Sequence, residues 1–314
     1  MFYNGKTVLV TGGTGFVGTH IVQELLKQDA NIVVPIHRRQ LVIDDNRIDT
    51  VYADLTRQED CLKISKDIDY IFHAAGDVAS AGVTTENLMK AISTNLIFTS
   101  QMLHAAWEEN VDRMLIFSSS TGYPVTNYPI KEEEMWNGPT HPTYFGYGWM
   151  RRYLERMGEF VASKSNVKIS IVRPTATYGN LDDSGHVIPS LIKRAIKKEN
   201  PFIVWGTGEE IRDFLHVSDL ARGCLLMLEK CANCDPVNIG YGKPVTIKEI
   251  VDIILSSTDH KDADIIFHSS KPGTIPIRMV DTTKARRLLN FEPEISLEKG
   301  LKDTIKWFEY TMRT

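Results

Sequence analysis

The sequence predicts an α/β protein with a doubly wound parallel sheet and a smaller, mixed α/β second lobe. From Lys6 to about Val172, short runs rich in Val and Ile alternate with longer segments of helical apolar spacing. Continuous apolar runs of this length are typical of parallel strands that are buried on both faces of a sheet. A glycine-rich turn joins the first such run to the first helical segment, which is how a doubly wound sheet begins. Beyond Pro174 the alternation changes, so we expect a different architecture there.

Five apolar runs are expected strands, and two segments between them are expected crossover helices. The strands are Thr7–Val10, Ile32–Val34, Tyr70–Phe72, Met114–Phe117 and Ile169–Val172. A further strand is expected to end just before Asp54. Phe16–Lys27 and Leu96–Trp107 repeat apolar residues every three or four positions, as helices that pack on a sheet must.

The turn Thr11–Gly18 has a Gly-x-x-Gly-x-x-Gly spacing, which predicts dinucleotide binding when it lies between a strand and a helix. Gly12 permits the tight turn, Gly15 lets the backbone approach a pyrophosphate, and Gly18 allows close packing of the helix on the strand. The free N–H groups at the start of the helix then bind the anion. Because glycines also serve turns for conformational reasons alone, the pattern has meaning only together with its strand and helix. We therefore predict a Rossmann dinucleotide-binding unit.

The end of the second strand decides which dinucleotide is bound. An acidic residue there would bind the ribose hydroxyls of NAD, whereas a cation would accept the 2′-phosphate of NADP. Arg38 and Arg39 follow this strand and no acid occupies its end, so the charges favour NADP(H), with NAD(H) as the alternative. Asp54–Leu55 is expected to contact the adenine, to form a helix-capping box with Thr56 and Glu59, or to do both.

The second lobe begins with a Gly- and Asp-rich loop at Tyr178–Gly185, followed by helices with short strands between them. The helices are expected to start near Val187, Val217, Ile247, Thr282 and Leu297. We divide the chain into a dinucleotide-binding Rossmann domain at 1–173 and a lobe formed mainly by 174–314, and leave open that segments near 212–245 return to the first domain. In such a fold the ligand crevice lies at the carboxyl ends of the parallel strands.

The composition excludes several classes of function. The 36 Lys and Arg residues nearly balance 40 Asp and Glu, and no basic block could follow a phosphodiester backbone, so we expect no nucleic-acid partner. The N-terminal residues lack a signal-peptide pattern and no run approaches about 18 apolar residues, so we expect a cytoplasmic protein without membrane association. Cys231 and Cys234 form one Cys-x-x-Cys pair without a second pair or a nearby His, so we expect reduced thiols and no bound metal.

Several of these segments resemble the extended short-chain dehydrogenase/reductase family, which comprises nucleotide-sugar epimerases, dehydratases and reductases. The resemblance extends over nearly the whole chain, and the matching segments are Thr11–Gly18, Asp54–Leu55, His73–Gly76, Asn95, Ser118–Ser120, Tyr147–Glu155, Arg173–Pro174 with Tyr178–Gly179, and Arg212–Val217. Within this family the second half is most similar to the GDP-L-fucose synthases, at Gly185–Pro189, Val204–Gly208 and Glu294–Leu301. The resemblance implies a Rossmann fold, an NAD(P) cofactor and a second lobe that binds a nucleotide sugar.

The resemblance also implies which residues bind the cofactor and how the protein assembles. The cofactor residues are Gly12, Thr14, Gly15, Phe16, Val17, Gly18, Arg38, Arg39, Asp54, Leu55, Ala74, Ala75, Gly76, Asn95, Tyr147, Arg151 and Pro174. The helix that bears Tyr147 and the long helix from about Met89 to Trp107 resemble the four-helix interface common in this family. We therefore expect a homodimer.

The catalytic pattern of the family is a Tyr, a Lys four residues later, and a Ser or Thr from the loop after the fifth strand. The resemblance places Tyr147, Arg151 and Ser119 at these positions, so Arg replaces the usual Lys. Residues four apart share one face of a helix, where the cation lowers the phenol pKa and reaches the nicotinamide ribose. Arg keeps the positive charge but is longer, planar and never neutral, so the ribose contacts change. The alternative is that Tyr147 is a buried aromatic and Arg151 forms a surface ion pair.

Neighbouring positions decide which ring protons the enzyme could move. Ser119 is expected to hydrogen-bond the sugar oxygen that Tyr147 protonates or deprotonates, or else to close a turn. Dehydratases carry an Asp-Glu pair after this hydroxyl, which Ser120 and Thr121 do not supply, so a dehydratase is disfavoured. In fucose synthases a Cys and a His move protons beside the ketone. The resemblance places Thr121, whose hydroxyl cannot act as a base, at the Cys, and His186 at the His, where it either transfers a proton or merely starts a helix.

The remaining candidates belong to the substrate site, where the resemblance places them by position. The full set is Ser119, Thr121, Val187, Arg194, Trp205, Arg212 and Arg278. The three arginines are expected near the diphosphate, because Arg forks bind phosphate oxygens bidentately. Trp205 is expected near the base or the sugar. The alternative is that the arginines are surface charges and Trp205 is a core residue.

Three functions remain open at this point. The leading one is an NAD(P)-dependent oxidoreductase or epimerase that acts at C4 of a nucleotide hexose, expected to be GDP-linked. The second is a UDP-sugar 4-epimerase that retains tightly bound NAD. The third, motivated by Arg151, is an NAD(P)-binding scaffold or sensor without turnover. Because Thr121 removes a base, hydride transfer at C4 is favoured over double epimerisation.

Overall fold

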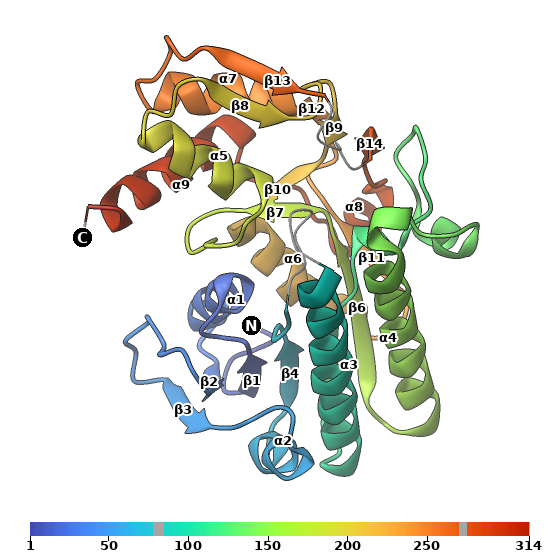
Figure 1. The fold of residues 1–314 in the computed structure, drawn as a ribbon. Helices are drawn as coiled ribbons and strands as arrows, with labels where there is room; N and C mark the ends of the chain where they lie inside the picture. Colours follow the sequence, from blue (N-terminus) through green and yellow to red (C-terminus); the bar gives the residue numbers. More distant parts are fainter. Residues whose placement is uncertain (78–84, 270–274, 314) are drawn as a thin grey trace.

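The chain folds into two lobes, of which the larger contains a seven-stranded sheet with helices on both faces (Figure 1). The computed structural model describes residues 1–77, 85–269 and 275–313. No helix within these ranges is long and apolar enough to cross a membrane. The predicted α/β class with a smaller mixed lobe is confirmed.

Five of the seven strands of the large sheet contain the expected apolar runs, a sixth is the strand expected before Asp54, and the seventh, Val237–Ile239, was not among the expected strands. In spatial order the seven strands are β11 (Val237–Ile239), β6 (Lys168–Pro174), β5 (Arg113–Phe117), β4 (Tyr70–His73), β1 (Thr7–Thr11), β2 (Asn31–Ile36) and β3 (Ile48–Tyr52). All neighbouring strands pair in parallel. The chain moves outward in opposite directions from β1 and β4, so the carboxyl ends of these two strands form the switch point at which doubly wound sheets bind ligands.

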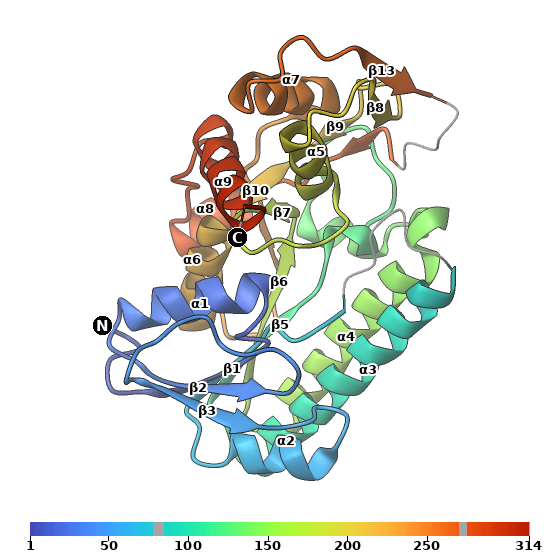
Figure 2. The same ribbon diagram turned by 60° about the vertical axis from the view of Figure 1, so that its left-hand side comes forward.

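Two sets of helices cover the two faces of this sheet (Figures 1 and 2). They are α1 (Phe16–Leu26) and α6 (Val217–Lys230) on one face, and α2 (Gln58–Ser65), α3 (Thr85–Glu108) and α4 (Phe145–Lys164) on the other. In β1, Val8 and Val10 belong to the first core and Leu9 to the second, because alternate side chains of a strand point to opposite faces. Continuous apolar runs were the right signal because both faces are buried.

The glycine turn between β1 and α1 has the backbone that its sequence predicted. Gly12 has φ +72°, and a Cβ on it would lie 2.6 Å from the backbone nitrogen of Ala75, beyond β4. A Cβ on Gly18 would overlap the carbonyl oxygen of Gly12, so only glycine lets α1 pack this closely on the turn. The conformational reasons given for Gly12 and Gly18 are therefore confirmed. The approach of a pyrophosphate to Gly15 stays a prediction.

The second lobe packs short strands against three helices. Its strands are β7 (Ala176–Tyr178) with β10 (Phe214–His216), β8 (Phe202–Trp205) with β13 (Ile265–His268), and β9 (Ile211–Arg212) between β12 (Val245–Thr246) and β14 (Ile277–Arg278). Its helices are α5 (Val187–Ile196), α7 (Ile247–Ser257) and α9 (Leu297–Thr311), which share one core. Strand β11 and helix α8 (Thr283–Leu289) follow parts of this lobe in the chain but pack with the large sheet.

A buried ion pair fixes α4 to the sheet. Arg173 on β6 donates from Nε and Nη2 to the carboxylate of Glu155 on α4, at 2.8 and 2.6 Å. Both side chains are at most 2% exposed. The Nη1 group of Arg173 also donates to the Tyr123 hydroxyl and to the Glu132 carbonyl, in the segment that follows β5. One guanidinium thus holds together β6, α4 and the loop after β5.

We predict that Glu155→Ala lowers the free energy of unfolding by about 3–5 kcal/mol, because it leaves the Arg173 charge buried without its partner. Glu298→Ala is the matched control, because the Glu298–Lys302 pair is exposed to solvent and contributes little to stability. Urea unfolding followed by circular dichroism measures both. Equal losses in the two variants would contradict the role given to the buried pair.

Candidate active site

The centre of the predicted site is a buried hydrogen-bonded pair on α4. The Nη2 group of Arg151 donates to the Tyr147 hydroxyl at 2.5 Å and to Oδ1 of Asn95 at 3.2 Å, and its Nη1 donates to the carbonyl of Phe117 at 3.0 Å. Tyr147 is 5% exposed and Arg151 is 8% exposed. The alternative of a surface ion pair for Arg151 is therefore wrong, because the side chain lies inward across the end of β5.

Asn95 on α3 supports this pair, and His73 is buried at the end of β4. The Asn95 amide donates to the carbonyls of Asp77 and Ala91, and its remaining oxygen accepts from Arg151. His73 lies 2.8 Å from the Thr11 hydroxyl through Nδ1 and is 3% exposed. Burial, aided by the charge of Arg151, lowers the pKa of His73 to about 3, so the ring is neutral. His73 lies in one of the segments that match the family, but no role could be assigned to it from the sequence. The signal available for its burial was its position at the end of an apolar strand.

Ser119 and Thr121 form a hydrogen-bonded turn beside the pair. The Ser119 Oγ atom accepts from the N–H of Thr121 at 3.2 Å and from its hydroxyl at 2.9 Å, at the start of a short 3₁₀ turn. The turn interpretation of Ser119 is therefore correct, and it leaves the Ser119 O–H as a donor. A Cβ on Gly148 would lie 2.6 Å from the Thr121 carbonyl. This glycine, which the sequence analysis missed, lets the turn approach α4 next to Tyr147.

The residues around the switch point fit a dinucleotide. Gly15 is the N-cap of α1 without a side-chain cap, and no acidic residue lies in the first turn, so the first N–H groups remain free for an anion. Thr14 and Val17 are partly exposed at this helix start. The Nε group of Arg151 is buried and has no hydrogen-bond partner among the described residues. These are the donors that a pyrophosphate and a ribose would need.

The two arginines after β2 and the acid after β3 lie at the surface. Arg38 and Arg39 are exposed in the turn that follows β2. Asp54 Oδ1 accepts from the N–H and the hydroxyl of Thr56, which lowers the pKa of Asp54. The expected helix-capping box is wrong, because α2 begins only at Gln58, with Arg57 at its N-cap. The carboxylate closes a turn with Thr56 instead.

Two arginines of the second lobe lie side by side. Arg212 on β9 and Arg278 on β14 are partners in the strand register, so their side chains share one face. Arg212 is 9% exposed, and burial together with the charge of Arg278 lowers its pKa to about 10. The Arg278 guanidinium lies 5.6 Å from the ring centroid of Tyr144, at the start of α4. The paired cations therefore face the helix that carries Tyr147.

The other predicted substrate residues are dispersed over the second lobe. His186 is the N-cap of α5 but its imidazole makes no capping bond, and Val187 follows it at 37% exposed. Arg194 forms an ion pair with Glu199 at 2.6 Å, as its surface-charge interpretation expects. Trp205 is 52% exposed, so the alternative of a core residue is wrong.

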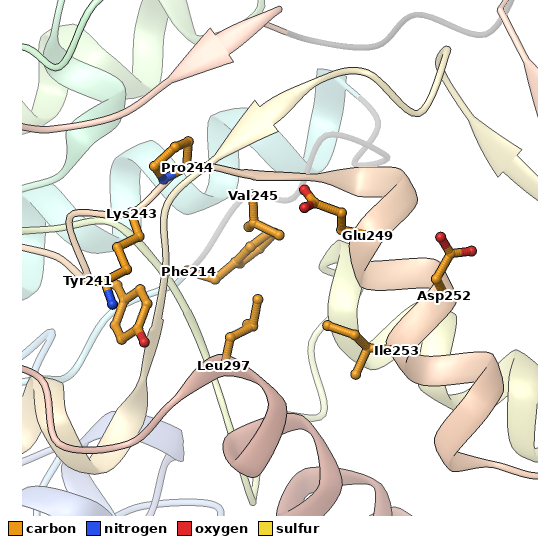
Figure 3. Close-up of a pocket in the computed structure, with 9 residues that line it drawn as sticks. All are labelled: Phe214, Tyr241, Lys243, Pro244, Val245, Glu249, Asp252, Ile253 and Leu297. Carbon is orange, nitrogen blue, oxygen red and sulfur yellow. The ribbon is translucent and has the colours of Figure 1, made fainter.

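A separate cavity of about 410 Å³ lies in the second lobe (Figure 3). It is lined by Phe214, Tyr241, Lys243, Pro244, Val245, Glu249, Asp252, Ile253 and Leu297. None of these belongs to the predicted site. The Glu249 carboxylate is already engaged in capping α7 with Thr246. The cavity therefore adds no group to the chemistry around Tyr147.

A tyrosine held by a cation at the switch point of a doubly wound sheet is typical of enzymes that use NAD(P) to oxidise or reduce a substrate. Comparison with known proteins makes the assignment definite. The chain belongs to the NAD dependent epimerase/dehydratase family, whose model matches residues 8–240. It is thus an NAD(P)-dependent enzyme of the nucleotide-sugar epimerase and reductase family.

Individual relatives are distant and differ in substrate. GDP-L-fucose synthase of Escherichia coli (strain K12) is 29% identical over 324 residues, which cover 96% of each chain. The dTDP-4-dehydro-6-deoxy-D-allose reductase of a Streptomyces species is 27% identical and covers 98% of each chain. The solved UDP-glucose 4-epimerase of Thermotoga maritima, with UDP-glucose, aligns with a TM-score of 0.87 at 26% identity, over 98% of this chain and 99% of that one. The predicted family and fold are confirmed.

Proposed function

We propose that this enzyme transfers a hydride at C4 of a nucleotide hexose, with a GDP-linked 4-keto sugar as its substrate. The observation that carries the proposal is the buried bond from Arg151 to Tyr147, beside the free O–H of Ser119. When bound, the nicotinamide supplies or accepts the hydride at C4. The residues of the chain then have to hold the sugar oxygen and move its proton.

Ser119 and Tyr147 share the C4 oxygen in this proposal. The Ser119 hydroxyl accepts two hydrogen bonds from Thr121, so its own proton is directed away from that residue and toward the sugar oxygen. Tyr147 gives a proton to this oxygen during reduction and takes one during oxidation. The Arg151 guanidinium at the phenol oxygen favours the negative charge that develops there when the proton leaves.

Arg151 fulfils two roles that the family assigns to Lys. One edge of its planar fork is committed to Tyr147, Asn95 and Phe117, which fixes the guanidinium in one orientation. Its Nε group, buried without a partner among the described residues, is the donor that would hold the nicotinamide ribose. An NAD(P)-binding scaffold without turnover does not need this bond to the phenol, so the geometry supports an enzyme.

The choice of a GDP-linked sugar rests on the similarity to GDP-L-fucose synthase of E. coli. The Arg212 and Arg278 pair supports a diphosphate ligand of any base. A UDP-sugar 4-epimerase is the second candidate, because the T. maritima epimerase aligns over nearly its whole length. Incubation with GDP-, UDP-, CDP- and dTDP-linked 4-keto sugars and NADPH separates the candidates, as does the cofactor released on denaturation. Tightly held NAD and turnover of UDP-sugars only would contradict the GDP-sugar proposal.

We predict that Tyr147→Phe reduces turnover by about two orders of magnitude or more, because the ring remains but the transferable proton is lost. The affinity for the cofactor should stay nearly unchanged. Tyr128→Phe is the control, since its hydroxyl bonds to Glu134 in an exposed loop. Steady-state rates and cofactor titration measure both variants, and unaltered turnover in Tyr147→Phe would remove this residue from the mechanism.

We infer that Arg38 and Arg39 select NADP(H) over NAD(H), because they follow β2 at the surface with no acid at the strand end. The double variant Arg38→Ala and Arg39→Ala should weaken NADP(H) binding much more than NAD(H) binding, since only NADP(H) has a 2′-phosphate to lose. Arg287→Ala, exposed on α8, is the control and removes one positive charge at the surface away from β2. Fluorescence titration with both cofactors provides the comparison, and equal weakening would show that the arginines do not discriminate.

We also infer that the enzyme is a homodimer through α3 and α4, which lie side by side on one face of the sheet (Figures 1 and 2). Large apolar side chains on these helices are exposed: Met89, Ile97, Phe145, Trp149, Tyr153 and Phe160. Such a cluster is typical of a covered protein surface. Light scattering at micromolar concentration should give twice the mass of one chain, and a monomeric mass would contradict the inference.

A further inference from the structure

Two consecutive arginines on α4 bind the backbone on either side of Ser119. Arg151 donates from Nη1 to the carbonyl of Phe117 at 3.0 Å, just before Ser119 in the chain. Arg152 donates from Nε to the carbonyl of Gly122 at 2.7 Å, just after it. The short segment that carries the Ser119 hydroxyl is therefore held to α4 at both ends.

Arg152 is a buried charge without an ion-pair partner among the described residues. It is 1% exposed, and its Nη2 group donates to the carbonyl of Gly138 at 2.8 Å. Its guanidinium lies 4.7 Å from the ring centroid of Trp149 and 5.4 Å from that of Trp136. Bonds to carbonyls and contacts with aromatic faces offset part of the cost of burying the charge. An apolar side chain would pack α4 without that cost, so the bonds to the loop after β5 are what the arginine contributes.

The turn that contains Ser119 lies against the face of α4 that Gly148 and Arg152 share. These two residues are four apart, so they are neighbours on one side of the helix. A Cβ on Gly148 would lie 2.6 Å from the Thr121 carbonyl, which shows how closely the turn approaches the helix. Gly148 provides the space and Arg152 the bond. Because Tyr147 directly precedes Gly148, this contact sets where the Ser119 hydroxyl lies relative to the phenol.

The rest of the loop after β5 is held by contacts that do not involve Arg152. The Ile130 N–H donates to the carbonyl of Met279, in the second lobe, at 3.2 Å. Arg173 on β6 donates to the Tyr123 hydroxyl at 2.9 Å. Loss of Arg152 should therefore loosen the attachment of the turn to α4 without unfolding the loop.

We propose that Arg152 is a positioning residue that holds the Ser119 hydroxyl beside the Tyr147 phenol, so that both groups reach one sugar oxygen. This rests on the proposed function, in which Ser119 and Tyr147 share the C4 oxygen. Arg152 transfers no proton and acts through the backbone of Gly122. Because small displacements of catalytic groups slow the chemical step, loss of this anchor affects turnover more than binding.

The first test is kinetic. Arg152→Met removes the donors but keeps an unbranched side chain, and it should lower kcat for a GDP-4-keto-6-deoxy hexose with NADPH by about tenfold to a hundredfold. The KM of the sugar and the Kd of the cofactor should change by less than about threefold. Arg156→Met is the matched control, because Arg156 also contacts the Trp136 ring, at 4.2 Å, but pairs with Glu159 at the surface. It should leave kcat unchanged, and light scattering should give both variants the mass of the wild-type assembly.

A double variant separates positioning from a general loss of structure. Ser119→Ala removes the hydroxyl that Arg152 is proposed to hold, so adding Arg152→Met to it should lower kcat by less than about threefold further. If the two losses multiply in full, Arg152 acts on α4 as a whole and the proposal is overturned. Arg152→Lys, which keeps the charge and one donor group, provides the same comparison if circular dichroism shows that Arg152→Met does not fold.

The second test needs no substrate. The Thr121 N–H donates to Ser119 Oγ at 3.2 Å, and the Gly122 N–H donates to the Ser119 carbonyl at 3.1 Å. Amide hydrogen exchange followed by mass spectrometry should be at least about fivefold faster in this turn in Arg152→Met than in wild-type enzyme. Exchange within α4 should not change, and Arg156→Met should behave as wild type.

The outcomes distinguish this role from the proposed function. If no nucleotide sugar is turned over but exchange in the turn rises only in Arg152→Met, the proposed function fails and the anchoring of the turn by Arg152 stands. If C4 reduction proceeds and Arg152→Met changes neither kcat nor exchange in the turn, or if exchange rises equally throughout α4, the positioning role is overturned.

Discussion

The buried ion pair between Arg173 and Glu155 joins the elements that carry the proposed catalytic groups. Tyr147 and Arg151 lie on α4 and Ser119 lies after β5, so nothing in the chain itself sets the distance between them. Arg173 contacts the helix through Glu155 and the segment after β5 through Tyr123, from a single strand of the sheet. Moving the helix would separate the two buried charges and leave each without its partner, which is costly. The ion pair therefore holds α4 in one position relative to the sheet.

Two residues that differ from the family pattern are each accommodated by specific contacts. Arg151 is longer than the usual Lys and has more N–H donors. Asn95 and the Phe117 carbonyl accept hydrogen bonds from these additional donors. Thr121, in place of a Cys, cannot act as a base but orients the Ser119 hydroxyl. Together these contacts support the proposed hydride transfer at C4 over proton movement at two ring carbons.

The strands and the glycine turn, which depend on local sequence pattern, could be predicted. Side-chain contacts and exposure, which depend on elements distant in the sequence, could not. Apolar runs buried on both faces identified the strands, and the spacing of Gly12 and Gly18 identified a turn whose close contacts were then found. The predicted capping box at Asp54 is wrong because the Asp54 carboxylate closes a turn with Thr56 and α2 begins only at Gln58. The hydrogen bonds of Arg151 and the exposure of Trp205 could not be derived, because both depend on how separate elements meet.

The fate of a labelled hydride tests the proposed transfer at C4 directly. Purified enzyme is incubated with a GDP-4-keto-6-deoxy hexose and NADPH that carries deuterium at C4 of the nicotinamide, and the product is analysed by NMR. Wild-type enzyme and a variant that lacks His186 should both form product with one deuterium, at C4 of the sugar. Product without deuterium at C4, or with the label at another ring carbon, would contradict hydride transfer at the carbon that Ser119 and Tyr147 address.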